Sequence, residues 1–211
     1  TITLSATDKA ALNQIVNKDG TVSTDATTYN LAAAEDWAAG ANASVNVVDA
    51  TGNGITTSNV AVPAITSAAY NSSTGALVVT GAGFLKASGS ANDIDASKFT
   101  FTGEGGATYS WTDTAGGGVT SGTAFTLTLS ATDKAAVKLL LNKAGTTSTD
   151  ATTYNLAAAE DWAPGADAAV TLADLTGNGI TVSIPSSGGG GGGAGGGNGN
   201  TTTTIVDGTP I

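Results

Sequence analysis

Apolar and polar residues alternate in residues 123–130, where Phe125, Leu127 and Leu129 fall on one face. This two-residue period is typical of a half-buried β-strand. Earlier stretches are also strand-like and flank short turn sequences, Asn-Ser-Ser-Thr-Gly in one case and Glu-Gly-Gly in the other. Two hairpins are therefore expected, from 64–70 with 76–81 and from 98–103 with 107–112.

The pattern changes to a helical period after Ser130. Ser130 and Asp133 have the S-x-x-D spacing that caps a helix N-terminus. The apolar residues that follow predict a helix that ends before Gly145, a suitable residue just beyond a C-terminus. A second, shorter helix is expected over residues 156–162. Residues 168–174 and 179–183 are expected to form a closing hairpin.

An internal repeat explains much of this pattern. The stretch LSATDKAA begins at Leu4 and again at Leu129, 125 positions later. At this offset, residues 1–58 match residues 126–183, and 42 of the 58 aligned pairs are identical. We therefore divide the chain into the C-terminal half of a first repeat unit, a complete second unit, a Gly-rich linker and a β-prone tail strand, at residues 1–60, 61–185, 186–200 and 201–211.

The first unit lacks a front half within this sequence, and two explanations stay open. Either the chain is part of a longer tandem array, or another segment completes the unit. In the second case, apolar side chains within residues 1–60 need partners, and an open sheet edge readily accepts an added strand. The tail tethered by the Gly-rich linker is a candidate donor to another subunit. The residues expected to take part in assembly are Thr203, Ile205, Val206, Ile211, Leu4, Leu12 and Ile15.

The charge of the chain excludes some classes of binding partner. The net charge is −10, with seven Lys and neither Arg nor His. A nucleic acid needs clustered basic residues, and an anionic membrane surface would repel the chain, so neither is expected as a partner. No apolar run reaches the length of about 18 residues that a membrane helix needs, so membrane insertion is not expected either.

Calcium is the ligand that the acidic residues favour, because Ca²⁺ binds several carboxylate and amide oxygens. Asp93 and Asp95 lie in one short stretch, and Asp49 and Asp174 begin the two closing turns. The alternative is that Asp and Asn serve as turn formers. No cofactor other than calcium is expected.

No catalytic residue set is expected, and we predict that the protein is not an enzyme. A Ser-His-Asp triad is excluded because the chain has no His. The paired acids at 35–36 and 160–161 are adjacent in sequence, so on a helix they would not face each other. The three Trp residues are expected to pack in cores more readily than to form a sugar-binding platform.

The closing motifs DATGNGITTS (49–58) and DLTGNGITVS (174–183) resemble the last hairpin of bacterial immunoglobulin-like repeats. The opening stretch 64–84 is similar to the first hairpin of such modules. The resemblance implies immunoglobulin-like β-sandwich repeats, here with a short helical insertion in each unit. Such repeats occur in tandem in secreted adhesins and surface-layer proteins, so it also implies a secreted protein of the bacterial cell surface.

Together these observations predict an extracellular structural protein that self-assembles into a surface filament or fibre by strand exchange between subunits. Its expected partners are copies of itself or neighbouring repeats, and a host or glycan surface. Two alternatives stay open. One is a stalk fragment of a large tandem-repeat adhesin or surface-layer protein, and the other is an accessory glycan-binding module of a secreted enzyme.

Overall fold

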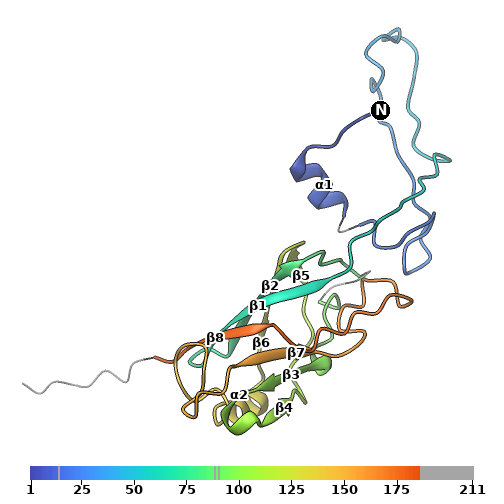
Figure 1. Cartoon of the computed structure of the whole chain (residues 1–211). Coiled ribbons are helices and arrows are strands. Elements are labelled where there is room, and N and C mark those ends of the chain that lie inside the picture. The colour runs from blue at the N-terminus through green and yellow to red at the C-terminus, as the bar shows by residue number, and fades with distance from the viewer. Residues whose placement is uncertain (14, 88, 90, 186–211) are drawn as a thin grey trace, which may run out of the picture.

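The computed structural model describes residues 1–185, except residues 14, 88 and 90. Residues 61–185 form a folded β-sheet unit, called here the complete unit. Residues 1–60 lie beyond one end of that sheet and are called the half-unit (Figure 1). Within the described residues, no helix is long and apolar enough to cross a membrane.

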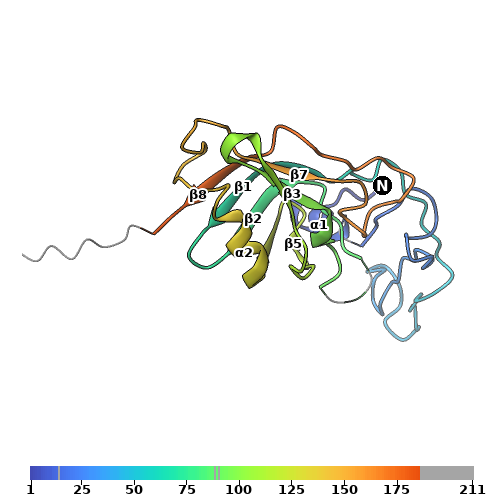
Figure 2. The ribbon, with the colours of Figure 1, turned by 90° about the horizontal axis from the view of Figure 1, so that it is seen from below.

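The protein is mainly β, as predicted. All eight strands that the described residues form belong to the complete unit and make one curled, mixed sheet (Figure 2). Its order is β4-β3-β7-β8-β1-β2-β6-β5, and the pairing of β1 with β8 is parallel. The strands are β1 Ala64–Asn71, β2 Ala76–Ala82, β3 Phe99–Thr102, β4 Thr108–Ser110, β5 Val119–Ser121, β6 Ala124–Thr128, β7 Asn155–Ala158 and β8 Gly179–Ser183.

Both hairpins predicted from the sequence are confirmed. Strands β1 and β2 pair antiparallel across the Asn-Ser-Ser-Thr-Gly turn. In this turn Gly75 has a φ of +81°, a conformation that residues with a side chain rarely adopt. Strands β3 and β4 pair in the same way. Strand β6 follows the predicted alternation, with Phe125 and Leu127 buried.

The helices are shorter and fewer than predicted. Helix α2 spans Ala131–Val137, and its counterpart α1 spans Ala6–Leu12; two 3₁₀ turns span Ala96–Lys98 and Glu104–Gly106. The predicted continuation of α2 toward Gly145 is wrong. The chain leaves α2 after Val137, as the half-unit leaves α1 after the equivalent Leu12; Leu141 then enters the core, and the Leu140 carbonyl accepts a hydrogen bond from the Glu104 amide at 3.0 Å.

Two other predictions are also wrong. Residues 156–162 do not form a short helix; β7 pairs with β3 and buries Leu156 and Ala158 on alternate positions, and the identical residues 31–37 of the half-unit are not helical either. Residues 168–174 do not pair with 179–183 as a closing hairpin. Strand β8 lies between β7 and β1, so sheet partners from elsewhere in the chain have replaced the local one.

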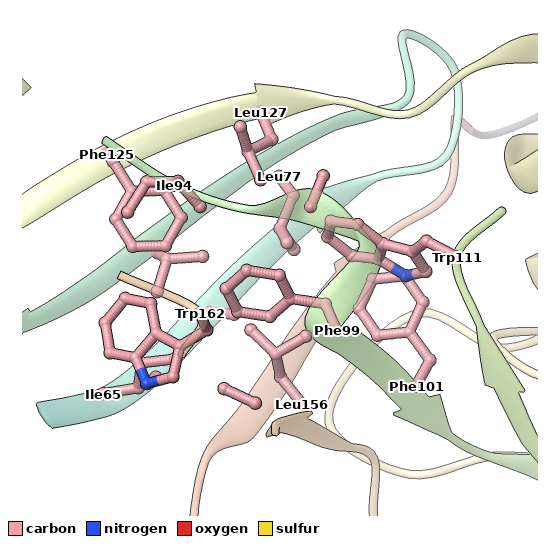
Figure 3. Packing of buried hydrophobic residues seen from close by; sticks show 14 of the residues in the cluster. Ile65, Leu77, Ile94, Phe99, Phe101, Trp111, Phe125, Leu127, Leu156 and Trp162 are labelled. Atoms are coloured by element: carbon pink, nitrogen blue, oxygen red, sulfur yellow. The ribbon is translucent and has the colours of Figure 1, made fainter. Parts of the chain in front are cut away.

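The curled sheet encloses an aromatic core (Figure 3). Trp162 is fully buried and packs near Phe99 and Phe125, with ring centroids 5.9 and 6.1 Å away. Trp111 stacks on Phe99 at 5.2 Å. These rings come from strands and loops on both sides of β7 and β8. The core therefore forms only when the strands on both sides of β7 and β8 are in place.

The half-unit touches the end of the complete unit through a small polar joint. The Asn17 side-chain amide donates to the Lys86 carbonyl at 3.3 Å, and the Lys18 ammonium lies 3.7 Å from an Asp167 carboxylate oxygen. The Val60 amide, in the connection between the two units, donates to Asp19 at 2.9 Å. The first two contacts connect the half-unit to the complete unit, and the third lies within residues 1–60.

Candidate assembly site

The complete unit consists of two interleaved parts, which the repeat defines. The front half is residues 62–125, and the back half is residues 126–183, the part that recurs as residues 1–58. Strands β7 and β8 of the back half insert into the middle of the sheet, where β7 pairs with β3 and β8 pairs with β1. Front-half strands therefore flank the back half on both sides.

The half-unit reproduces the internal pairing of the back half without any front half. Each of its isolated β-bridges lies 125 positions before a pairing in the complete unit. The equivalent pairs are Gly20–Thr57 and Gly145–Val182, Val22–Thr28 and Thr147–Thr153, Asn30–Gly54 and Asn155–Gly179, and Ala33–Asp49 and Ala158–Asp174. Local sequence alone is therefore enough to form this framework.

The side chains that hold the framework are also equivalent. The Trp37 indole N–H donates to the Val47 carbonyl at 2.7 Å, as that of Trp162 donates to Leu172 at 2.9 Å. Both closing turns are held by an Asn side chain that donates to an Asp carboxylate at 2.9 Å. The half-unit thus has the conformation that the back half adopts when it is packed against the front half.

The two copies differ in burial. Trp37 is 62% exposed, whereas Trp162 is fully buried. Leu31 is also 62% exposed, whereas its equivalent Leu156 is fully buried, and Leu4 is 45% exposed against 4% for Leu129. The predicted assembly residues Leu12 and Ile15 are exposed as well. The apolar surface that the front half covers in the complete unit is therefore open to solvent in the half-unit.

Asp133 is the main polar contact between the two halves of the complete unit. Its fully buried carboxylate accepts hydrogen bonds from the Tyr109 hydroxyl at 2.8 Å, and from the amide and hydroxyl of both Thr112 and Thr114 at 2.6–2.9 Å. All three donor residues belong to the front half. Asp133 therefore ties α2 to the loop that follows β4.

These contacts keep Asp133 ionised. Burial by itself would raise the pKa of this carboxyl, but the hydrogen bonds from Thr114, Thr112 and Tyr109 outweigh burial and lower the pKa far below its ordinary value. The equivalent Asp8 is exposed, and its carboxylate accepts a hydrogen bond from the Ser5 hydroxyl at 2.7 Å.

Glu104 makes a second polar contact, in the opposite direction. This front-half carboxylate accepts from the Thr149 hydroxyl at 2.7 Å, the Thr149 amide at 2.9 Å and the Asn142 side chain at 2.8 Å. The hydrogen bonds from Thr149 and Asn142 lower the pKa of Glu104. In the half-unit the equivalent Asn17 donates to the Thr24 hydroxyl at 2.9 Å, as Asn142 also does to Thr149 at 3.3 Å, and Asn17 donates to the Lys86 carbonyl as well.

The predicted calcium residues all accept hydrogen bonds within loops and turns. Asp93 is buried and accepts from the Ala87 and Val119 amides, both at 2.7 Å. Asp95 caps the 3₁₀ turn Ala96–Lys98, while Asp49 and Asp174 brace the closing turns. The described part of the chain contains no group of three or more acidic side chains placed to hold a metal ion. Calcium stays a prediction.

The paired acids are likewise used for structure. Glu160 accepts from the Leu172 and Ala173 amides at 2.8 and 3.0 Å, and Glu35 accepts from the Val47 amide at 3.1 Å. Of the three Trp residues, Trp111 and Trp162 lie in the core, so only Trp37 presents its ring at the surface. The tail residues Thr203, Ile205, Val206 and Ile211 lie outside the described residues.

Comparison of the chain with protein-family models, with curated protein sequences and with solved structures found no match. The candidate site therefore rests on the internal repeat. The sequence indicated its apolar residues, but Asp133 and Glu104 were not predicted as contacts. The repeated S-x-x-D motif singles out Asp133 in the sequence, but by itself it predicts only a helix cap.

Proposed function

We propose that this protein is an extracellular structural repeat protein that assembles into a surface filament or fibre when β-strands from another subunit complete its half-unit. One observation carries the proposal. The half-unit has the shape of the back half, yet exposes the apolar surface that the front half covers elsewhere in the same chain. Such a surface is stabilised when a partner removes it from water.

The open edges give the partner a mode of binding. The segments equivalent to β7 and β8 lack the neighbours that β3 and β1 provide in the complete unit. An added strand would supply main-chain hydrogen bonds, and its alternate side chains would pack on the apolar face. The tail strand of another subunit is one candidate donor. Because donation from subunit to subunit does not close on itself in general, it produces filaments.

The repeat itself favours a second candidate, a stalk segment of a tandem array of adhesin or surface-layer type. Residues 1–58 and 126–183 share 42 of 58 residues, which is the similarity expected of consecutive units. In either version we propose a secreted protein of the bacterial surface with immunoglobulin-like repeats. Calcium and a host or glycan surface remain parts of this proposal.

Negative-stain microscopy of the purified chain tests assembly, with a matched sample that lacks residues 186–211. Filaments that disappear on truncation would support donation of the tail. Filaments that persist would support assembly through the half-unit with another donor. Monomers in both samples at high concentration would contradict self-assembly and favour the array.

A pair of charge substitutions tests the acceptor surface. Leu31→Glu places a charge on the open face of the half-unit, so filaments should be lost, because an added strand would bury that charge. Leu139→Glu is the matched control. Leu139 is 76% exposed, follows α2 in the complete unit and is not part of the open face of the half-unit. Equal loss with both variants would contradict an acceptor site in the half-unit.

A further inference from the structure

We propose that the partner of the half-unit is the front half of a further repeat unit, recognised through Asp8 and Thr24 and enclosing Trp37. This inference rests on the proposed function, because it names the partner of the same open surface. It specifies a segment of about 64 residues with the pattern of residues 62–125, rather than a single added strand.

The polar residues that contact the front half are retained in the half-unit. In the complete unit, back-half side chains bond to front-half groups at several separate places, including Ser130 to Asp113, Lys134 to the Ser73 carbonyl and Asp174 to the Ile65 amide. Every one of these back-half residues is identical in the half-unit. The equivalent pairs are Ser130–Ser5, Asp133–Asp8, Lys134–Lys9, Asn142–Asn17, Thr149–Thr24 and Asp174–Asp49.

The aromatic contacts require more than one strand. In the complete unit Trp162 packs against Phe84, Phe99 and Phe125, which come from separate parts of the front half, with centroids 5.8–6.1 Å away. Trp37 has no such rings around it among the described residues. The tail, residues 201–211, contains no aromatic residue. An eleven-residue strand could therefore pair with one edge but could not rebuild this core.

The chain's own front half cannot serve as the partner. It is already packed on residues 126–183, and copies that exchange front halves would still have one open back half each.

The length of the linker also prevents the half-unit from binding the front half of its own chain. Ser183 lies beside Asn71 in the parallel pair, so the equivalent Ser58 would have to connect back to Ala64 over about 23 Å of strand. Five linker residues span only about 20 Å, and parallel strands need a crossover of about a dozen residues.

The sharpest test adds the proposed partner to the full chain. A second copy of residues 62–125 is joined directly before Thr1, which reproduces the natural junction between Phe125 and Thr126. With 5-fluorotryptophan labelling, the ¹⁹F signal of Trp37 should move from a solvent-exposed to a buried environment. Exchange of the Gly20 and Ala33 amides should slow by at least about a hundredfold, toward the rates of Gly145 and Ala158.

Recognition by Asp8 is tested by Asp8→Asn in both formats. In the extended chain the substitution should speed exchange of the Ala33 amide by at least about tenfold, because Asp8 would accept from the added copy's Tyr-Ser-Trp-Thr-Asp-Thr segment. In the original chain it should change that rate little. An equal effect in both formats would reduce Asp8 to a local cap of α1 and overturn this part of the inference.

A separate polypeptide of residues 62–125, titrated into the full chain, covers the case in which the extended chain fails to fold. It should bind and bury Trp37. If Trp37 stays exposed in both formats, the front half is not the partner, even when the original chain forms filaments. If Trp37 becomes buried but the original chain never forms filaments, this inference holds and self-assembly does not.

Discussion

At the scale of single residues, the repeat places the same side chain in two environments. Asp133 and Asp8 share the local sequence SATDKAA, and each follows a serine N-cap. Asp133 is fully buried and accepts hydrogen bonds from three front-half residues, whereas Asp8 is exposed. Any difference in what the two carboxylates contribute to stability therefore comes from tertiary contacts and not from helix capping.

Asp133→Asn should destabilise the complete unit by about 3 kcal/mol at pH 7, because the buried donors lose a charged acceptor. Asp8→Asn should change stability by less than about 0.5 kcal/mol. Urea unfolding of the two variants and of the natural chain measures both effects. Equal losses would show that the aspartates act through the helix cap alone.

The effect of Asp133 should also depend on pH. Because folding lowers the pKa of this carboxyl, its contribution is complete above about pH 4, the pKa of an unfolded aspartate, and is lost as the pH falls toward the folded value. The gap in unfolding free energy between the natural chain and Asp133→Asn should thus narrow below about pH 4. A gap that stays constant from pH 7 to pH 3 would contradict this assignment.

At the scale of elements, hairpins followed their local sequence and the remaining elements did not. Strands β1 and β2 meet through a turn that their own residues specify. The segment 156–162 has good helix formers, yet its first residues belong to β7, and its identical copy 31–37 is not helical either, although no β3 lies beside it. Both copies instead bridge to their own closing segment, at Ala33–Asp49 and Ala158–Asp174. Propensity is a weak preference that such pairing overrides.

Gly81 provides a test of the β1–β2 pair. A Cβ at this position would lie 2.1 Å from the Ala64 carbonyl oxygen and 2.4 Å from the Phe84 ring. Gly81→Ala should therefore force the hairpin and Phe84 apart and cost about 1–3 kcal/mol. Gly105→Ala offers a contrast with open space around the new Cβ, where the cost should come from its φ of +67° alone. Thermal unfolding of both variants measures the difference.

At the scale of the whole molecule, two copies of one framework should differ in stability. Equivalent backbone hydrogen bonds have nearly equal lengths, such as 3.0 Å from the Tyr29 amide to Thr21 and 3.0 Å from the Tyr154 amide to Thr146. Only the complete unit adds an aromatic core to them. Local opening depends on buried contacts as well as on hydrogen bonds.

Hydrogen exchange of the natural chain should show this difference directly. The amides of Gly20, Tyr29 and Ala33 should exchange at least about a hundredfold faster than those of Gly145, Tyr154 and Ala158. The comparison is matched pair by pair, because sequence and hydrogen bonding are nearly the same. Similar protection in both copies would show that the half-unit is already complete in solution.

The mainly β class, the two hairpins, the serine cap of α2 and the relation between the two copies follow from the sequence alone. Each of these features depends on residues that are close together in the chain or on direct comparison of the two repeated sequences. The apolar members of the candidate site, including Leu4 and Leu12, were predicted for the same reason.

The place of β8 beside β1, the pairing of β7 with β3 and the contacts of Asp133 and Glu104 depend on the tertiary structure alone. These features join residues far apart in the chain, and an aspartate or glutamate has the same local sequence whether a distant donor reaches it or not. The half-unit shows the reason physically. Its local sequence is enough to form the framework, but burial of Trp37 requires a front half.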